Sequence, residues 1–285
     1  MSQPDGEITH VSDTALMVAA CRALEADAED GFVHDPFAAR LAGERGMAIL
    51  RALPHAQVLR FGVGTRSRFM DELLLEAFAA RRIETVVSLG CGLDTRPWRL
   101  DLLPDLRWIE VDFPEMLDYK DAIMSAIPPR CRRERMTADL NDAAQRRAVY
   151  AAVGSAPALM ITEGLLMYLP AATVEALAAE PPQESGIAWW LADINTTAFS
   201  QALGGQFNRS VSHVRAADAV PGERILEMAL RHGWTTAARR SYLTDMAFAE
   251  PRIKRMFGDR PRPDPPPIPL DDPTGVHLFA RTVEG

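Results

Sequence analysis

The sequence predicts an α/β fold in which a mostly parallel sheet carries helices on both faces and follows a helical N-terminal segment. Two patterns carry this prediction. The first 80 residues show helical periodicity, whereas short apolar runs alternate with helical patterns beyond them. Such alternation is typical of a parallel sheet covered on both faces. We therefore expect an N-terminal helical cap of residues 1–82 and a core of residues 83–285.

The N-terminal segment contains three helical patterns. Apolar residues recur with helical spacing at residues 15–24, in DPFAARLAGERG at residues 35–46, and at residues 67–80. Asp35 directly precedes Pro36. Because proline fits the first position of a helix and aspartate is a preferred cap, Asp35 is expected to be the N-cap of the second helix.

Six short runs in the rest of the chain predict strands: TVVSLG, RWIEVD, ERMTAD, PALMITEG, GIAWWLAD and, near the end, VHLFARTV. Helical patterns lie between several of them, and a further helix is expected at residues 222–232. Trp189 and Trp190 are adjacent on one strand, so each is expected to pack against a different helix layer. Residues 194–218 are expected to form a loop or cap insertion, and the proline-rich residues 261–273 an extended connector.

Composition argues against several classes of protein. The sequence contains neither an apolar stretch of the roughly 20 residues that span a bilayer nor a signal-peptide pattern. Three cysteines without a CxxC pair indicate a reducing cytoplasm, with no disulfide framework and no metal site. The net charge of −8 argues against a nucleic-acid partner. We expect a cytoplasmic protein that acts on a small molecule.

The run VVSLGCGLDTR, residues 86–96, ends a predicted strand with two glycines one residue apart. Such glycines let the backbone approach a ligand closely, although a plain strand-to-helix turn would also explain them. Asp112 follows at the end of the next strand, 22 positions after Gly90. A carboxylate there can accept hydrogen bonds from the two ribose hydroxyls of an adenosine group. Both NAD and S-adenosylmethionine carry that group, and this spacing fits both.

Two positions favour S-adenosylmethionine. The dinucleotide-binding fingerprint requires a third glycine where this chain has Thr95. Asp94, just behind the glycines, would repel a pyrophosphate but suits a cofactor that carries an ammonium and a sulfonium group. An NAD-dependent oxidoreductase is therefore the less favoured alternative, beside a protein that binds the cofactor without turnover.

Four motifs, in order, resemble the leucine carboxyl methyltransferase superfamily: VVSLGCGLDTRPWRL, IEVDFPEMLDYK, ADL and TEGLLMYL. Within it, the chain is similar to the bacterial tetracenomycin-type polyketide O-methyltransferases. The resemblance runs from about Ser12 to about Tyr168. It implies a Rossmann-like class I methyltransferase with a seven-stranded sheet and S-adenosylmethionine as cofactor.

The resemblance also implies roles for the residues around the first two motifs. The backbone at Gly90, Cys91 and Gly92 would approach the amino-acid end of the cofactor. Asp112 would bind the ribose hydroxyls, and Phe113 would lie beside the adenine.

Further roles follow for the later motifs and for the helix before the first strand. Asp139 and the backbone of Leu140 would contact the amino edge of the adenine. Glu163 and Gly164 would lie under the methionine part. Arg66 would pair with the cofactor's carboxylate; otherwise it would be a solvated helix arginine.

Methyl transfer of this kind requires alignment and a dry site from the protein, because the sulfonium already activates the methyl group. A carboxylate acceptor, with an ordinary pKa of about 4, requires no general base. The motifs contain no evident His or Lys base, so we expect a small-molecule carboxylate as acceptor and a methyl ester as product. Tyr168 is the candidate catalytic residue; alternatively it is a core aromatic residue with its hydroxyl at the edge.

Overall fold

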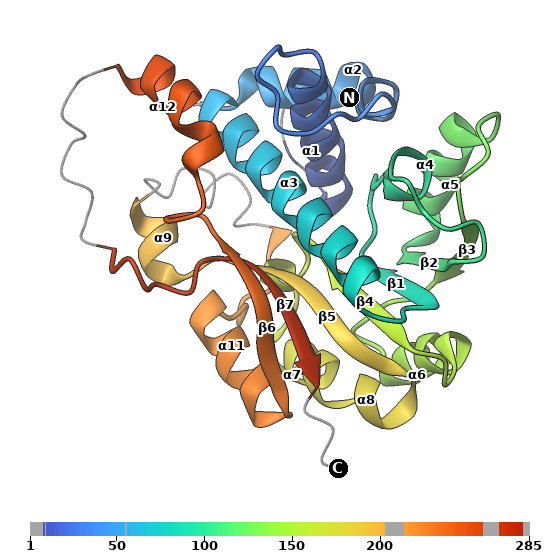
Figure 1. Ribbon diagram of the computed structural model, residues 1–285. Coiled ribbons are helices and arrows are strands. Elements are labelled where there is room, and N and C mark those ends of the chain that lie inside the picture. Colours follow the sequence, from blue (N-terminus) through green and yellow to red (C-terminus); the bar gives the residue numbers. More distant parts are fainter. Residues whose placement is uncertain (1–7, 9, 55, 203–213, 259–267, 282–285) are drawn as a thin grey trace.

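The structure, a computed structural model, describes residues 8, 10–54, 56–202, 214–258 and 268–281. In these ranges a central sheet has helices on both faces (Figure 1). Helices from the N-terminal part lie over the end of the sheet to which its parallel strands point. In open α/β sheets, ligands bind at this carboxyl end.

The sheet has seven strands in the order β3-β2-β1-β4-β5-β7-β6. All neighbouring pairs from β3 to β5 are parallel, whereas β7 is antiparallel to both of its neighbours. The expected mostly parallel, seven-stranded sheet is thereby confirmed. The strands are β1 (Thr85–Leu89), β2 (Arg107–Asp112), β3 (Arg132–Thr137), β4 (Ala158–Thr162), β5 (Ile187–Ile194), β6 (Trp234–Ser241) and β7 (Gly275–Arg281).

The strand β6 is not among the six runs that the sequence predicts to be strands. It is an edge strand, paired only with β7 in the sheet, and its central residues are exposed or half-buried. Its sequence, WTTAARRS, therefore lacks the continuous apolar character of the inner strands. A strand with one unpaired edge can carry polar side chains, since it is not covered on all sides.

Three helices precede the sheet: α1 (Val11–Ala26), α2 (Ala38–Ala52) and α3 (Ala56–Ala80). The others are α4 (Arg96–Arg99), α5 (Pro114–Met124), α6 (Ala143–Val153), α7 (Ala171–Ala179), α8 (Pro181–Glu184), α9 (Thr197–Ala202), α11 (Gly222–Arg231) and α12 (Glu250–Phe257), with short 3-10 helices η1 (Leu166–Tyr168) and η3 (Ala247–Ala249). The helix α9 lies within the expected insertion 194–218, of which residues 203–213 fall outside the described residues. The expected connector 261–273 is described only from residue 268.

The expectation that Asp35 caps the second helix is wrong. The helix α2 begins at Ala38, and Phe37 holds its N-cap position. The carboxylate of Asp35 is buried: its Oδ1 accepts a hydrogen bond from the Phe37 N–H at 3.1 Å, and its Oδ2 accepts hydrogen bonds from Arg22 Nε, at 2.9 Å, and from Thr95 Oγ1, at 2.7 Å. Arg22 and Thr95 come from α1 and from the loop after β1, so Asp35 joins the N-terminal helices to the sheet.

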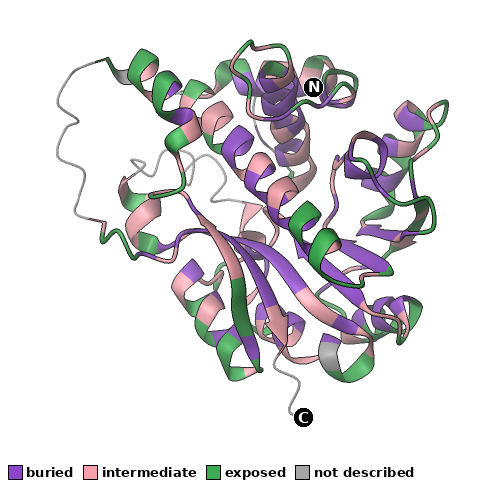
Figure 2. Ribbon diagram, viewed as in Figure 1, coloured by how far each residue is buried: buried purple, intermediate pink, exposed green. Residues whose placement is uncertain are grey.

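The core consists of layers on the two faces of the sheet and a third cluster among the N-terminal helices (Figure 2). The helices α6, α7 and α11 cover one face, and α3 covers the other. Trp190 is fully buried in the first layer, whereas Trp189 packs against the second. The prediction that these two residues face opposite helix layers is confirmed.

Candidate active site

A cavity of about 940 Å³ lies between the carboxyl ends of the parallel strands and the N-terminal helices. Its volume is near the upper end of the range of about 300–1,000 Å³ that is typical of ligand sites. Every residue that the sequence assigned to a site lines it: Arg66, Gly90, Cys91, Gly92, Asp94, Asp112, Phe113, Asp139, Leu140, Glu163, Gly164 and Tyr168. The fold therefore brings residues from all four motifs and from α3 to one place.

The glycine loop after β1 follows a backbone path that L side chains rarely adopt. Gly90 has φ 58° and Gly92 has φ 45°. A Cβ atom at Gly90 would also lie 2.6 Å from Leu165 Cδ1. Glycine at position 90 thus suits the positive φ, avoids a contact with the Leu165 side chain and leaves bare backbone beside the cavity.

Asp112, at the end of β2, is fixed by the loop that it faces. Its Oδ2 accepts a hydrogen bond from the Gly92 N–H at 2.7 Å, and its Oδ1 accepts one from the Phe113 N–H at 2.8 Å. Burial raises the pKa of Asp112, which these hydrogen bonds partly offset. Since each carboxylate oxygen can accept more than one hydrogen bond, the side chain can also bind two ligand hydroxyls.

Asp139 and Leu140 form the turn that follows β3. Asp139 is half-buried, and its Oδ1 accepts a hydrogen bond from the Asn141 N–H at 2.9 Å. The carbonyl oxygen of the buried Leu140 accepts one from Arg146 Nη1 at 2.8 Å. These contacts hold the turn against the cavity wall.

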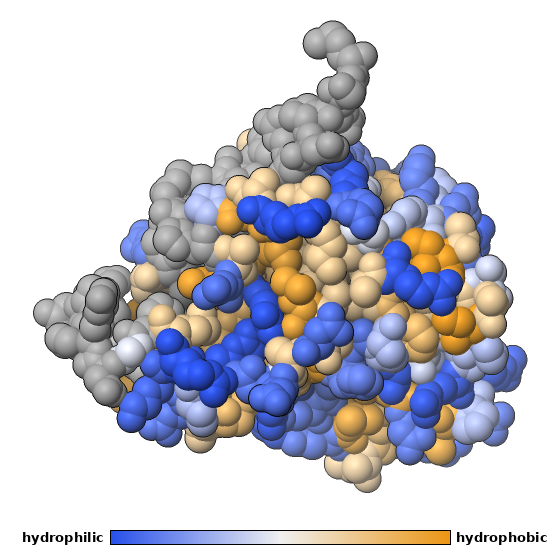
Figure 3. Space-filling view, turned by 90° about the horizontal axis from the view of Figure 1, so that it is seen from above, coloured by the Kyte–Doolittle hydropathy of each residue, from blue (hydrophilic) through white to orange (hydrophobic). Residues whose placement is uncertain are grey.

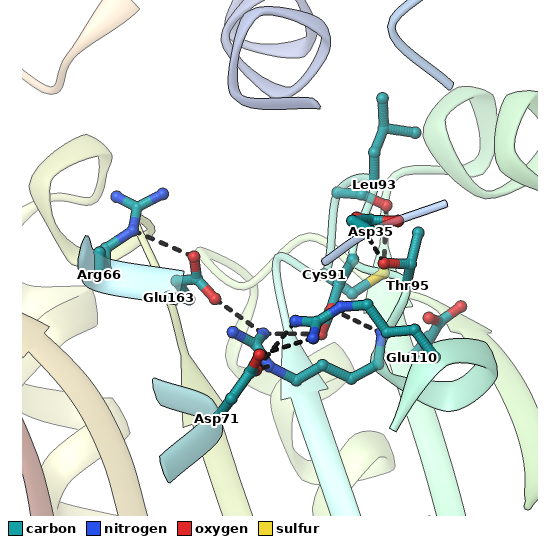
Figure 4. Close-up of polar contacts among 12 residues, drawn as sticks. Asp35, Arg66, Asp71, Cys91, Leu93, Thr95, Glu110 and Glu163 are labelled. Carbon is teal, nitrogen blue, oxygen red and sulfur yellow. Dashed lines mark hydrogen bonds and ion pairs between the residues drawn. The ribbon is translucent and has the colours of Figure 1, made fainter. Parts of the chain in front are cut away.

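Glu163, directly after β4, lies between two arginines (Figure 4). Its Oε1 is 3.0 Å from Arg66 Nε and its Oε2 is 2.7 Å from Arg96 Nη1. Burial opposes ionisation of this carboxyl group, but the guanidinium groups of Arg96 and Arg66 dominate and lower its pKa to about 2. Glu163 is therefore an anion at neutral pH and too weak a base to accept a proton readily.

Arg66 projects from α3 and is not the solvated surface residue of the alternative interpretation. Its side chain is 17% exposed, and its Nη1 lies 3.5 Å from Asp193 Oδ2 in addition to the Glu163 contact. Asp193 also accepts a hydrogen bond from the Gly164 N–H at 2.7 Å. A guanidinium has five N–H donors, so Arg66 retains capacity for an anionic ligand.

Asp94 is already engaged by a residue that the sequence analysis did not select. Its Oδ1 accepts a hydrogen bond from the Arg96 N–H at 3.0 Å, and its Oδ2 lies 3.1 Å from Arg96 Nη1. Arg96 is almost fully buried and also binds Asp71 at 2.6 Å. Because Arg96 offsets much of the charge of Asp94, the charge argument against a pyrophosphate is weaker than the sequence alone suggests.

Cys91 supports the glycine loop from the protein interior. Its N–H donates to the carbonyl oxygen of Val111 at 3.1 Å, and Lys120 Nζ lies 3.7 Å from its Sγ. Lys120 is itself buried and paired with Glu110 at 2.8 Å. Burial raises the pKa of the Cys91 thiol well above its ordinary value, so the thiol stays protonated at neutral pH. Cys91 is suited to packing rather than to nucleophilic attack.

Tyr168, at the end of η1, lines the cavity while its ring packs against the cluster of the N-terminal helices. Tyr168 is thus an aromatic residue of the core beside the cavity, and its catalytic role stays a prediction. Its hydroxyl is hydrogen-bonded to Thr14 of α1, and burial raises its pKa. A phenol with a raised pKa is a poor general base at neutral pH.

Neither a metal site nor a membrane span is found in the described parts of the chain. Within them, no group of three or more His, Cys, Asp or Glu side chains is arranged to hold a metal ion. No helix of these segments is long and apolar enough to cross a bilayer.

Comparison with known proteins finds the family of the chain. A sequence model described as leucine carboxyl methyltransferase matches residues 15–180. The chain is 38% identical over 183 residues to a protein of Mycobacteroides abscessus, provisionally named an S-adenosyl-L-methionine-dependent methyltransferase. That match covers 60% of this chain and 58% of the relative, so the matched segment spans less than two thirds of that protein. A relative from Streptomyces avermitilis with the same provisional name is 33% identical over 231 residues, covering 77% of this chain and 76% of the relative.

The fold also matches a solved structure. The crystal structure of a provisionally described methyltransferase from Thermobifida fusca aligns with a TM-score of 0.52 and 16% identity, covering 94% of each chain. This likeness shows the fold alone, which is the Rossmann-like methyltransferase fold that the resemblance implied. With the family model matching more than half of its length, the chain belongs to the leucine carboxyl methyltransferase family.

Proposed function

We propose that this protein is an S-adenosylmethionine-dependent O-methyltransferase that converts a small-molecule carboxylate to its methyl ester. The observation that carries the proposal is the cavity in which the glycine loop, the Asp112 carboxylate and the Arg66–Glu163 pair meet. These are the groups that a ligand with an amino-acid end and a ribose diol requires. Membership of the leucine carboxyl methyltransferase family supports the same activity.

The donor set fits S-adenosylmethionine. Asp112 accepts hydrogen bonds and suits the ribose hydroxyls, and Arg66 donates them and suits a carboxylate. Glu163 is an anion that suits an ammonium group. A cavity of about 940 Å³ leaves room for an acceptor beside the cofactor.

When bound, S-adenosylmethionine supplies a methyl carbon that its sulfonium has already activated. The protein contributes alignment and exclusion of water: α3 brings Arg66 to the strand ends, and the N-terminal helices cover the cavity. A carboxylate acceptor matches the absence of a suitable base among the motif residues. The pKa of Tyr168 is raised and that of Glu163 is lowered to about 2, so neither is poised to deprotonate a hydroxyl at neutral pH.

Several finer expectations from the sequence belong to this proposal. They are the tetracenomycin-type branch, a small-molecule partner rather than a nucleic acid, a cytoplasmic location, and the division into a cap of residues 1–82 and a core of residues 83–285. The oxidoreductase alternative gains no support from the family match.

Two measurements test the proposal. Titration calorimetry should detect binding of S-adenosylmethionine and S-adenosylhomocysteine but not of NAD. Tight NAD binding without a response to S-adenosylhomocysteine would contradict the proposal.

The methylated product should release methanol in mild alkali, as esters do and ethers do not. With an ionised acceptor the rate should be flat from about pH 6 to 9, whereas an alkali-stable product and a rate that rises through pH 8 to 9 would indicate a hydroxyl acceptor.

A further inference from the structure

Two residues that line the cavity carry a hydroxyl group with no hydrogen-bond partner among the described residues. They are Ser67, on α3, and Tyr242, directly after β6. Both hydroxyl oxygen atoms are buried. Buried polar groups of native proteins are nearly always paired, because an unpaired one keeps its desolvation cost. The unpaired hydroxyls of these two cavity-wall residues are therefore available to a hydrogen-bond acceptor that a ligand supplies.

Both hydroxyls lie beside the charged cluster of Arg66. Ser67 follows Arg66 on the same helix. The ring of Tyr242 stacks on Phe69 of that helix, with centroids 5.9 Å apart and planes inclined by 11°. Burial raises the pKa of Tyr242 well above its ordinary value. The negative charges of Asp193 and Glu163 raise this pKa further, whereas the positive charge of Arg66 lowers it. Tyr242 is thus protonated at neutral pH and serves as a hydrogen-bond donor.

The arginines that line the described cavity wall already contact carboxylates of the protein. Arg22 binds Asp35, Arg66 binds Glu163, and both Arg96 and Arg99 bind Asp71. The hydroxyl groups of Ser67 and Tyr242 are therefore unpaired donors for an anionic methyl acceptor, whereas the guanidinium groups are already in ion pairs with the protein.

Much of the cavity wall contributed by the N-terminal helices and by α12 is apolar. It includes Val58, Leu59 and Phe61 of α3, Met246 before η3, and Ile253 and Met256 of α12. Seen from the side of the N-terminal helices, apolar side chains gather near the centre of the face, between hydrophilic ones (Figure 3). Flexible methionine and aliphatic side chains suit a hydrocarbon body and offer no hydrogen bonds to a polar one.

We propose that the acceptor is an apolar monocarboxylic acid whose carboxylate is held by Ser67 and Tyr242 and whose hydrocarbon body lies against α3 and α12. This inference rests on the proposed function. A carboxylate oxygen can accept a hydrogen bond and still offer a lone pair to the methyl carbon. The new O–C bond forms as the C–S bond breaks, the bonding electron pair goes to sulfur, and no proton moves. The products are the methyl ester and S-adenosylhomocysteine.

The test measures binding of decanoate and acetate to protein saturated with S-adenosylhomocysteine, by titration calorimetry. Decanoate should bind and acetate, which shares the head but lacks the body, should bind far more weakly. Tyr242→Phe keeps the ring that stacks on Phe69 and should weaken decanoate binding about ten- to a hundredfold, as expected for the loss of a hydrogen bond to a charged group. Ser67→Ala should act in the same direction. Affinity for S-adenosylhomocysteine should stay unchanged in both variants.

Tyr150→Phe is the matched control. Its hydroxyl is also buried and without a partner among the described residues, but it belongs to α6 and does not line the cavity. This variant should bind decanoate as the wild type does. Equal decanoate affinity in the wild type, Tyr242→Phe and Ser67→Ala would overturn the inference and assign the two hydroxyls to water. Absence of decanoate binding to the loaded wild type would overturn the acceptor class, whereas failure of S-adenosylhomocysteine to bind would instead contradict the proposed function.

Discussion

Glu25 of α1 and Arg252 of α12 form a buried bidentate ion pair between positions 227 residues apart. Arg252 Nη2 lies 2.7 Å from Glu25 Oε1, and Nη1 lies 2.8 Å from Oε2. Glu25 is fully buried and also accepts hydrogen bonds from Arg60 Nε and the Phe32 N–H. Since α12 contributes Ile253 and Met256 to the cavity wall, this pair fixes one side of the proposed acceptor site to the N-terminal helices.

Replacing Glu25 should therefore destabilise the protein strongly. Glu25→Gln leaves the buried guanidinium of Arg252 without its counter-charge, at an expected cost of about 3–5 kcal/mol in the free energy of unfolding. Asp30→Asn is the control, because Asp30 pairs with Arg255 on the same helix but both side chains are exposed. It should cost no more than about 1 kcal/mol. Chemical denaturation at pH 7 measures both, and equal effects would contradict the role assigned to the buried pair.

Stability should also depend on pH through Glu163. Its folded-state pKa of about 2 lies below the ordinary value of 4.5, so ionised Glu163 stabilises the fold above about pH 4.5. That contribution, about 3 kcal/mol, should be lost as the pH falls from about 4.5 toward 2. Glu163→Gln should lower the free energy of unfolding at pH 7 and flatten its decline below pH 4.5. Parallel wild-type and variant curves of unfolding free energy against pH would show that the residue does not titrate in this range.

Cofactor affinity should respond to Asp112. Asp112→Asn replaces one acceptor oxygen by a donor and removes the charge, so binding of S-adenosylhomocysteine should weaken about ten- to a hundredfold. Asp139→Ala should have a smaller effect, provided that the Leu140 backbone still contacts the adenine. Asp118→Asn, an exposed residue of α5, serves as the control and should change nothing. Titration calorimetry decides, and wild-type affinity in Asp112→Asn would remove Asp112 from the site.

The two constraints on Gly90 can be separated by mutation. Gly233, just after the C-cap of α11, has φ 79° and open space where a Cβ atom would lie, so Gly233→Ala should cost only the positive-φ penalty of about 1–2 kcal/mol. Gly90→Ala adds a contact of 2.6 Å with Leu165 and should cost clearly more. The double variant Gly90→Ala, Leu165→Ala should lose less cofactor affinity than Gly90→Ala alone. Thermal unfolding and calorimetry measure the two effects; equal losses of stability in Gly90→Ala and Gly233→Ala would exclude the contribution of Leu165.

The positions of Gly90, Asp112, Asp139 and Glu163 could be predicted because each lies at the end of a predicted strand or just after it. Parallel strands end at the same edge of a sheet, so it can be predicted that residues at these ends lie close together even when the packing is not known. The resemblance to a family then supplied the role of each residue. Tertiary context overrode the local pattern at Asp35, where Arg22 and Thr95 draw a helix-cap residue into a buried pair.

The sequence by itself determined six of the seven strands, the helical character of the N-terminal segment and which residues would stand at the ends of the parallel strands, since these follow from periodicities of a few residues. Only the tertiary structure decided what these residues meet. Arg96, which lies between Asp94 and Glu163, could not be singled out from the sequence, because nearly all basic residues of the chain are arginines. Ser67 and Tyr242 are ordinary residues in the sequence and become distinctive only because the packing of α3 against the end of β6 buries both hydroxyls without partners among the described residues. Contacts between segments more than a hundred residues apart depend on how whole layers dock, which no local pattern records.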